Sequence, residues 1–153
     1  MYKKILVPVD GSSTALKGLT EALKLARALQ AKVKLVHVVN ELINDPTLTP
    51  SVYIERVIEN MRESGRKALA NAQAVAKQQE PDVEVEAELF ETIGARASDC
   101  IVTAATTWPA DLIVMGTHGR RGLKRLALGS DAEMILRSAP VPVLAVRETA
   151  GER

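Results

Sequence analysis

The sequence predicts a three-layer α/β fold, in which helices cover both faces of an open, parallel, five-stranded sheet. Short apolar runs rich in β-branched residues alternate along the 153 residues with segments whose apolar residues recur at helical spacing. Strands that alternate with helices in this way are typical of parallel sheets joined by right-handed crossovers. No internal repeat, low-complexity tract or linker interrupts the pattern, so we expect a single domain over residues 1–153.

The first strand and the first helix are expected close to the N-terminus. Residues 5–9 read ILVPV, a short β-branched run that ends at the polar sequence DGSS. Apolar residues then recur at helical spacing over residues 16–29. Either Ser12 or Ser13 is expected to cap this helix, because a serine hydroxyl accepts hydrogen bonds from the free N–H groups of a helix N-terminus.

A second strand and a long helix follow. Residues 32–39 (KVKLVHVV) indicate the strand, and His37 within it is expected to be a hydrogen-bonded core histidine. A polar, proline-containing connector over residues 40–50 separates this strand from a helix over residues 52–79.

The third strand is expected at an edge of the sheet. Residues 83–90 alternate apolar with acidic side chains, which indicates a strand with one face in water. A helix over residues 93–107 follows and ends at Trp108. The single cysteine, Cys100, falls in this helix and is expected to be a buried, inert thiol.

The last third of the chain supplies two strands and one helix. A short apolar strand is expected at residues 111–116 (DLIVMG), a helix over 130–137, and the last strand at 141–147 (VPVLAVR). Residues 148–153 are expected to be frayed.

The predicted topology brings two unusual loops together. The usual order of five such strands is 3-2-1-4-5, which places the first and fourth strands side by side where the order reverses. Ligands of open α/β sheets bind there, beyond the carboxyl ends of the strands. The loops that leave these strands are the DGSS turn and the stretch MGTHGRRGLKRLALGSDAE at residues 115–133. Both are therefore expected to border one crevice.

The glycines of this stretch have the spacing Gly116-x2-Gly119-x9-Gly129-Ser130, with basic residues between them. Gly116 would let a ligand approach the backbone, and Gly119 would allow the positive φ values that form an anion nest. Gly129 and Ser130 open a helix, whose free N–H groups attract phosphate. We interpret the stretch as a phosphate cradle. The alternative is an irregular connection in which the glycines only permit tight turns.

The sequence at the start of the last helix also has interpretations that involve no phosphate. The sequence SDAE at residues 130–133 reads as a capping box, in which Ser130 and Glu133 satisfy the helix N-terminus without a ligand. Asp131 complements the helix dipole, but it would repel a polyphosphate if it pointed into the cradle.

Asp10 ends the first strand at the same crevice. A carboxylate there can accept hydrogen bonds from sugar hydroxyls or hold a hydrated Mg²⁺ ion. The alternative is an Asx turn within the DGSS sequence.

Other functions find less support in the sequence. There is no GxxxxGK[ST] motif and no GxGxxG after the first strand, so any nucleotide would be held from the fourth strand. No catalytic constellation or metal-ligand cluster emerges, and His118 is expected to face solvent. A net charge of +1 gives no overall field that would favour nucleic acid or an anionic membrane. Without a signal peptide or a membrane-length apolar run, a cytoplasmic protein is expected.

The last strand is expected to mediate self-association. If it lies at an edge of the sheet, its unpaired apolar run invites a partner strand, and pairing around a two-fold axis would give a homodimer. The alternative is an edge covered by the C-terminal tail. The side chains expected to point one way are Val141, Val143, Ala145 and Arg147.

The chain resembles the single-domain, nucleotide-binding members of the universal stress protein family. The segments KKILVPVDGSSTALKGL, KLVHVV and DLIVMGTHGRRGLKRLALGSDAEMILRSAPVPVLAVR carry the resemblance, which extends over almost the whole chain. The spacing G-x2-G-x9-G-[ST] is the ATP-binding signature of that family and is matched without insertion. The resemblance implies a Rossmann-like, adenine nucleotide alpha hydrolase-like fold, ATP in the crevice, and a dimer formed through the last strand. An Mg²⁺ ion held by Asp10 could accompany the ATP.

The resemblance also implies roles for individual residues. On the phosphate side, Asp131 departs from the small or apolar residue that nucleotide-binding members often have. Contacts to the nucleoside would come from Pro8, Val9 and Asp10, from the backbone of Val38 beside the adenine, and from Met115 and Gly116 beside the ribose. Contacts to the phosphates would come from Gly119, Gly129 and Ser130, next to the commonly basic position Arg120.

The leading hypothesis is an ATP-binding, homodimeric regulator or sensor in stress adaptation, with slow ATP hydrolysis at most. The alternative is a dimeric interaction or scaffold module whose crevice is empty or holds AMP, ADP or cyclic AMP. Its function would then reside in the dimer surface and in the 40–50 connector.

Overall fold

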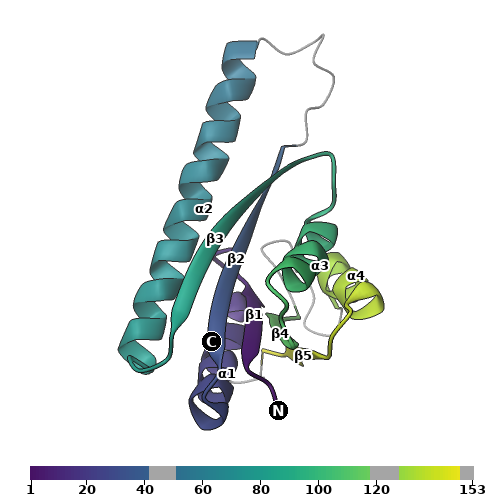
Figure 1. Cartoon of the computed structure of the whole chain (residues 1–153). Coiled ribbons are helices and arrows are strands. Elements are labelled where there is room, and N and C mark those ends of the chain that lie inside the picture. Colours follow the sequence, from purple (N-terminus) through teal and green to yellow (C-terminus); the bar gives the residue numbers. More distant parts are fainter. Residues whose placement is uncertain (42–50, 118–127, 149–153) are drawn as a thin grey trace.

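The computed structural model describes residues 1–41, 51–117 and 128–148, and within them a parallel β-sheet flanked by helices (Figure 1). The described elements are, in chain order, β1 (Lys4–Pro8), α1 (Ser13–Leu29), β2 (Lys32–Glu41), α2 (Ser51–Gln79), β3 (Val85–Ile93), α3 (Ala97–Thr107), β4 (Leu112–Gly116), α4 (Ser130–Ser138) and β5 (Val143–Val146). Each expected helix and strand is present.

The five strands are ordered β3-β2-β1-β4-β5 and every pair is parallel, which confirms the predicted topology. β1 pairs with β2 on one side (Ile5 with Val33) and with β4 on the other (Ile5 with Leu112). The order of the strands therefore reverses between β1 and β4. The carboxyl ends of these two strands are the expected place for a ligand.

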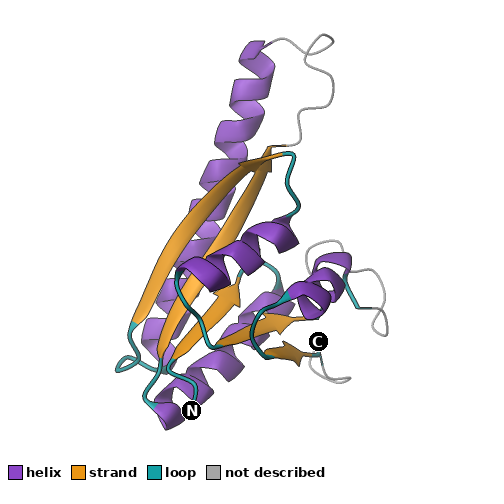
Figure 2. Ribbon diagram, turned by 45° about the vertical axis from the view of Figure 1, so that its right-hand side comes forward, coloured by secondary structure: helices purple, strands orange, loops and turns teal. Residues whose placement is uncertain are grey.

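Helices cover both faces of the sheet (Figure 2). On one face, α1 and α2 bury an apolar cluster with Leu19, Leu23 and Leu69 at its centre. On the other face, α3 and α4 bury a second cluster, to which Ile101 and Ile135 contribute. Strand residues alternate between the two clusters, because successive side chains of a strand point to opposite faces.

Several boundaries differ from the sequence-based expectation. β3 continues to Ile93, and α3 begins only at Ala97 instead of residue 93. Gly94 separates the two elements with φ of +76°, a left-handed conformation that glycine adopts without strain. β5 is shorter than expected, because the ladder to β4 starts at Val143, after Pro142.

The edge strand β3 has the expected wet face. Its glutamates pair with lysines of β2: Lys34 Nζ lies 2.5 Å from a carboxylate oxygen of Glu88 and 3.4 Å from one of Glu86. Desolvation of Lys34 opposes its charge, but the two carboxylates outweigh it and raise the pKa of Lys34. The same ammonium lies 5.7 Å from the ring centroid of Trp108, the residue at the end of α3.

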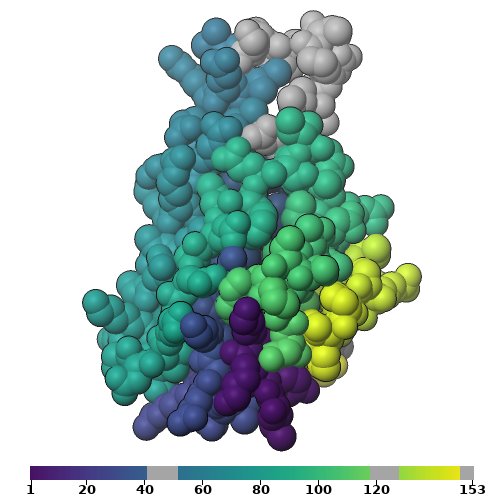
Figure 3. Space-filling model, in the orientation of Figure 1, coloured from purple at the N-terminus to yellow at the C-terminus, as the bar shows by residue number. Residues whose placement is uncertain are grey.

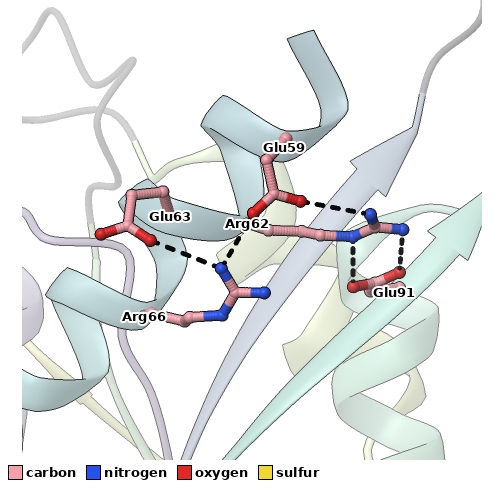
Figure 4. Close-up of polar contacts among 5 residues, drawn as sticks. All are labelled: Glu59, Arg62, Glu63, Arg66 and Glu91. Atoms are coloured by element: carbon pink, nitrogen blue, oxygen red, sulfur yellow. Dashed lines mark hydrogen bonds and ion pairs between the residues drawn. The ribbon is translucent and has the colours of Figure 1, made fainter. Parts of the chain in front are cut away.

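The long helix α2 is held against β3 by an ion-pair network (Figure 4). Arg62 Nε donates to Glu91 across the helix–strand boundary at 2.7 Å, and its Nη2 donates to the other oxygen at 3.0 Å. Arg66 donates to Glu59 at 3.1 Å and to Glu63 at 3.4 Å. All five side chains are partly or largely exposed, so the network orients α2 more than it stabilises the fold.

Candidate functional site

β1 ends at Pro8 while β2 continues to Glu41, so no described strand of the sheet continues β1 beside the second half of β2. The N–H group of Val9, just after β1, donates a backbone hydrogen bond to the carbonyl oxygen of Val36 in β2 at 2.9 Å. Alternate residues of a strand direct their backbone groups to the same neighbour. Val38 is therefore the next residue of β2 whose N–H and C=O face the space beyond β1.

The turn after β1 is organised by its own side chains. Asp10 Oδ1 accepts a hydrogen bond from the Ser12 N–H at 2.9 Å, and Gly11 has φ of +85°. The Ser12 hydroxyl accepts from the Ala15 N–H at 3.2 Å, so Ser12 is the N-cap of α1. The Asx turn that was the alternative role for Asp10 is thus formed, and one carboxylate oxygen already has a partner.

The side chain of His37 contacts the backbone just before this turn. Its Nδ1 lies 2.8 Å from the carbonyl oxygen of Val9, as expected for a hydrogen-bonded core histidine. On the other side of the ring, Gly65 of α2 makes room for it, since a Cβ atom there would lie 2.6 Å from His37 Cδ2. The histidine therefore joins α2 and β2 to the backbone that leaves β1.

Gly116 at the end of β4 makes room for a helix. A Cβ atom at Gly116 would lie 2.7 Å from the carbonyl oxygen of Thr14 and 2.8 Å from Thr14 Cγ2. Gly18, one helical turn further on, approaches the backbone of Met115 and Gly116 just as closely. The packing of α1 therefore requires a glycine at position 116 whether or not a ligand approaches its backbone, and the expected ligand contact stays a prediction.

The two described ends of the glycine-rich stretch meet directly. The N–H of Thr117, next after β4, donates to Val146 of β5 at 3.0 Å. Its carbonyl oxygen accepts from the N–H of Gly129, the residue before α4, at 2.8 Å. The first turn of α4 is therefore fixed beside the carboxyl end of β4. Gly119, Arg120 and His118 lie outside the described residues.

The N-terminus of α4 is not capped as expected. Gly129 is the N-cap residue and has no side chain to offer, and Ser130 is already the first helical residue. The capping box predicted for Ser130 and Glu133 is wrong, because the register is shifted by one residue. Glu133 instead pairs with Arg137 one turn further on, at 2.9 Å. Asp131 lies in the first turn with its side chain exposed.

Three buried side-chain atoms of the described residues have no hydrogen-bond partner: Asn40 Oδ1, Ser98 Oγ and Thr117 Oγ1. All three belong to residues near the carboxyl end of the sheet. Asn40 lies near the end of β2, Ser98 in the first turn of α3, and Thr117 just after β4. A buried polar atom without a partner is costly and is most often explained by a missing water or ligand. Sequence reasoning missed these residues, because no spacing rule distinguishes them.

The described site residues lie at the carboxyl end of the sheet, on β1, β2 and β4 and in the turn after β1, and at the start of α4. Val9 and Met115 are buried with their side chains in the two cores, so only their backbones are left to face a ligand. The residues brought to this edge are Pro8, Val9, Asp10, Val38, Met115, Gly116, Gly129, Ser130 and Asp131. No group of three or more potential metal ligands occurs in the described ranges.

β5 forms the second edge of the sheet, as expected, and its described strand partner is β4 alone. Val141, Val143 and Ala145 pack against the α3–α4 core instead of pointing to a free surface. Leu144 points away from that core and is 41% exposed. In Figure 3 the residues of α4 and β5, in yellow, lie on the surface on the side of the molecule away from α2. Within residues 1–41, 51–117 and 128–148, no helix has the length and apolar character needed to cross a membrane.

Comparisons with known proteins agree with one another. The model of the universal stress protein family matches residues 1–147. A universal stress protein of Methanocaldococcus jannaschii is 35% identical over 154 residues, covering 97% of this chain and 84% of the relative. The solved structure of a universal stress protein from Lactobacillus plantarum has a TM-score of 0.81 and 29% identity, covering 95% of this chain and 98% of that one. Another, from Archaeoglobus fulgidus in complex with dAMP, has a TM-score of 0.66 and 26% identity, covering 95% and 98%.

Proposed function

This chain belongs to the universal stress protein family, and we propose that it is a cytoplasmic, ATP-binding regulator or sensor in stress adaptation. The observation that carries the proposal is the junction of Thr117 with Gly129, which fixes an uncapped helix N-terminus beside the open end of β1 and β4. Such a terminus offers N–H donors and a positive dipole to phosphate. The relative from Archaeoglobus fulgidus, solved with dAMP, supports an adenine nucleotide as the ligand class.

The nucleotide would lie across the crevice. The backbone of Val38, facing the space beyond β1, would meet the adenine, while the turn at Asp10 would meet the ribose hydroxyls. The phosphates would extend toward Gly129 and Ser130, with Gly119 and Arg120 closing over them. The family's G-x2-G-x9-G-[ST] spacing, present without insertion, favours ATP over shorter nucleotides.

Most of the protein and nucleotide ligands of an Mg²⁺ ion bound with ATP would be phosphate oxygens. Asp10 is the one carboxylate that the first strand brings to the crevice, and one of its oxygens accepts from Ser12. Mg²⁺ in proteins is commonly held by one or two carboxylates together with phosphates and waters, so this donor set suits a nucleotide-bound ion. Among the described residues we identify no general base for water, so hydrolysis would be slow at most.

Homodimerisation through β5 is part of the proposal. The backbone edge of β5 that pairs with no described strand, together with the exposed side chain of Leu144, would pair with a second copy around a two-fold axis. Arg147, exposed just beyond the strand, would lie at the rim of this contact.

Calorimetric titration with ATP, ADP, AMP and cyclic AMP tests the proposal. We expect ATP to bind most tightly, and the absence of binding at millimolar nucleotide would overturn the proposal.

Ser130→Asp adds a carboxylate that suits the helix dipole but repels phosphate, so it should weaken ATP binding by about 3- to 10-fold without destabilising α4. Asp131→Asn should strengthen it by a similar factor. Asp99→Asn removes the same charge from the first turn of α3 and serves as the matched control.

The second candidate function is a dimeric interaction module that holds no nucleotide, or holds AMP, ADP or cyclic AMP. The exposed Leu144 at the edge of the sheet favours it, because this feature needs no ligand. The same titration separates the two functions: a dimer without affinity for ATP supports the interaction module.

A further inference from the structure

We propose that the hydroxyl group of Thr117 is a phosphate ligand, which donates a hydrogen bond to an oxyanion held at the N-terminus of α4. The inference rests on the proposed nucleotide site and deepens it. It names a side chain that the glycine spacing does not include and assigns it to the phosphates rather than to the nucleoside.

The first observation is that the Thr117 hydroxyl is buried without a partner. Thr117 is only 5% exposed, and its Oγ1 has no hydrogen bond, although both of its backbone groups are bonded. Leaving a buried hydroxyl unpaired costs free energy that substitution by an apolar side chain would avoid. A threonine at this position is therefore expected to have a partner when the protein functions.

The second observation is where this hydroxyl lies. Met115, two residues earlier, packs in the α3–α4 core with Ala132 and Ile135, so strand alternation places the Thr117 side chain on the α4 side of the sheet. Its carbonyl oxygen accepts from the N–H of Gly129 at 2.8 Å, which holds the residue against the first turn of α4. Gly129 offers no capping side chain to that turn.

An oxyanion suits both features at once. The first-turn N–H groups of α4 are donors, and a hydroxyl can add one more donor to the same acceptor. A cationic group would be repelled by the positive end of the helix, and a neutral group would gain less from it than an anion. The ligand chemistry shared by both groups is a phosphate oxygen, whether from a nucleotide or from free phosphate.

The test compares Thr117→Val with Thr117→Ser. Valine keeps the shape of threonine without the hydroxyl, and serine keeps the hydroxyl. For Thr117→Val we expect about 10- to 100-fold weaker binding of AMP and ATP, because one charge-assisted hydrogen bond to the phosphate is lost. Adenosine affinity should be unchanged, and Thr117→Ser should stay within about threefold of the parent protein. The melting temperature of the ligand-free valine variant should equal or exceed that of the parent, because an unpaired buried hydroxyl has been removed.

Ser98→Ala is the matched control, since it removes another buried hydroxyl without a partner, on α3. This variant should leave the difference between the affinities for AMP and for adenosine unchanged. Equal AMP affinity of the valine variant and the parent would overturn the inference. So would a valine variant that loses adenosine affinity and melting temperature together, because that pattern indicates a purely structural role.

Pyrophosphate separates failure of this inference from failure of the proposed function. If the parent protein binds no nucleotide, the proposed function fails, and pyrophosphate is then titrated into parent and Thr117→Val. Binding that depends on the hydroxyl supports the inference as a site for free phosphate. No pyrophosphate binding by the parent overturns it as well.

Discussion

The carbonyl oxygen of Thr14 in α1 lies 2.7 Å from where a Cβ atom at Gly116 would stand. This contact brings the first turn of α1 against the end of β4, at the point where the order of the sheet reverses. The start of α1 and the end of β4 are thereby held against each other. A residue of the predicted phosphate cradle thus has a packing role that is independent of any ligand.

Gly116→Ala should consequently destabilise the fold. The backbone of Thr14 cannot move aside without shifting α1, so we expect a loss of about 1–3 kcal/mol in the free energy of unfolding, as for other overpacked sites. Urea denaturation measures it. Gly94→Asn is the control, because Gly94 has open space around it and asparagine tolerates positive φ. A stability loss no greater than that of the control would contradict the packing role.

Gly65→Ala should disturb the support of the turn after β1. The new methyl group would lie 2.6 Å from the His37 ring and 2.8 Å from Leu89 Cδ1. We expect about 1–3 kcal/mol of destabilisation. Part of this loss should disappear when His37→Ala is combined with it, since the shortened side chain frees the space. A double-mutant cycle by chemical denaturation checks the coupling, and purely additive effects would show that the ring does not define this contact.

Capping should matter at α1 and not at α4. Ser12→Ala removes the hydroxyl that accepts from the Ala15 N–H and should cost about 1 kcal/mol. Ser13→Ala and Ser130→Ala alter first helical residues, not N-caps, and should change stability by less than about 0.5 kcal/mol. Thermal unfolding of the three variants gives the comparison. A large loss at Ser130 would restore the capping box.

The network between α2 and β3 should contribute stability only above mildly acidic pH. Hydrogen bonds from Arg62 lower the pKa of Glu91, and those from Arg66, with a smaller share from Arg62, lower that of Glu59. Because these pKa values are depressed in the folded state, the contribution is complete above the unfolded-state values and is lost as pH falls through the folded ones. The variant Glu59→Gln/Glu91→Gln should therefore be less stable than the parent at pH 7, and the difference should disappear as the pH falls below the lowered pKa values of the two carboxylates. Glu55→Gln is the control on the same helix, and a difference that persists in acid would contradict the electrostatic origin.

Leu144→Lys should dissociate the proposed homodimer. The side chain is 41% exposed on the free edge strand, and a charge there opposes edge pairing. We expect the mass measured by light scattering to fall from dimer to monomer, while the melting temperature of the monomer changes little. Ser138→Lys, on the exposed end of α4, is the control. A parent protein that is already monomeric would end the dimer proposal.

Much of this protein could be predicted from local sequence patterns. The alternation of apolar runs indicated each strand and helix, and the usual order of five parallel strands, 3-2-1-4-5, is the one that the structure has. The DGSS turn and the start of α4 could likewise be placed at one crevice, because the carboxyl ends of parallel strands share an edge. Periodicity and topology are sufficient for these conclusions, since they depend on backbone geometry that every parallel sheet shares.

Only the tertiary structure decided which group each residue contacts. The sequence offered Ser130 and Glu133 as a capping box, but the helix begins one residue earlier than that box requires, with Gly129 as its N-cap, and Glu133 pairs with Arg137. It gave no sign that Gly116 also packs against Thr14, and the unpaired hydroxyl of Thr117 carried no signal at all. Burial and hydrogen bonding depend on contacts between elements that are distant in the sequence. A spacing motif can therefore place a site without identifying the atoms that form it.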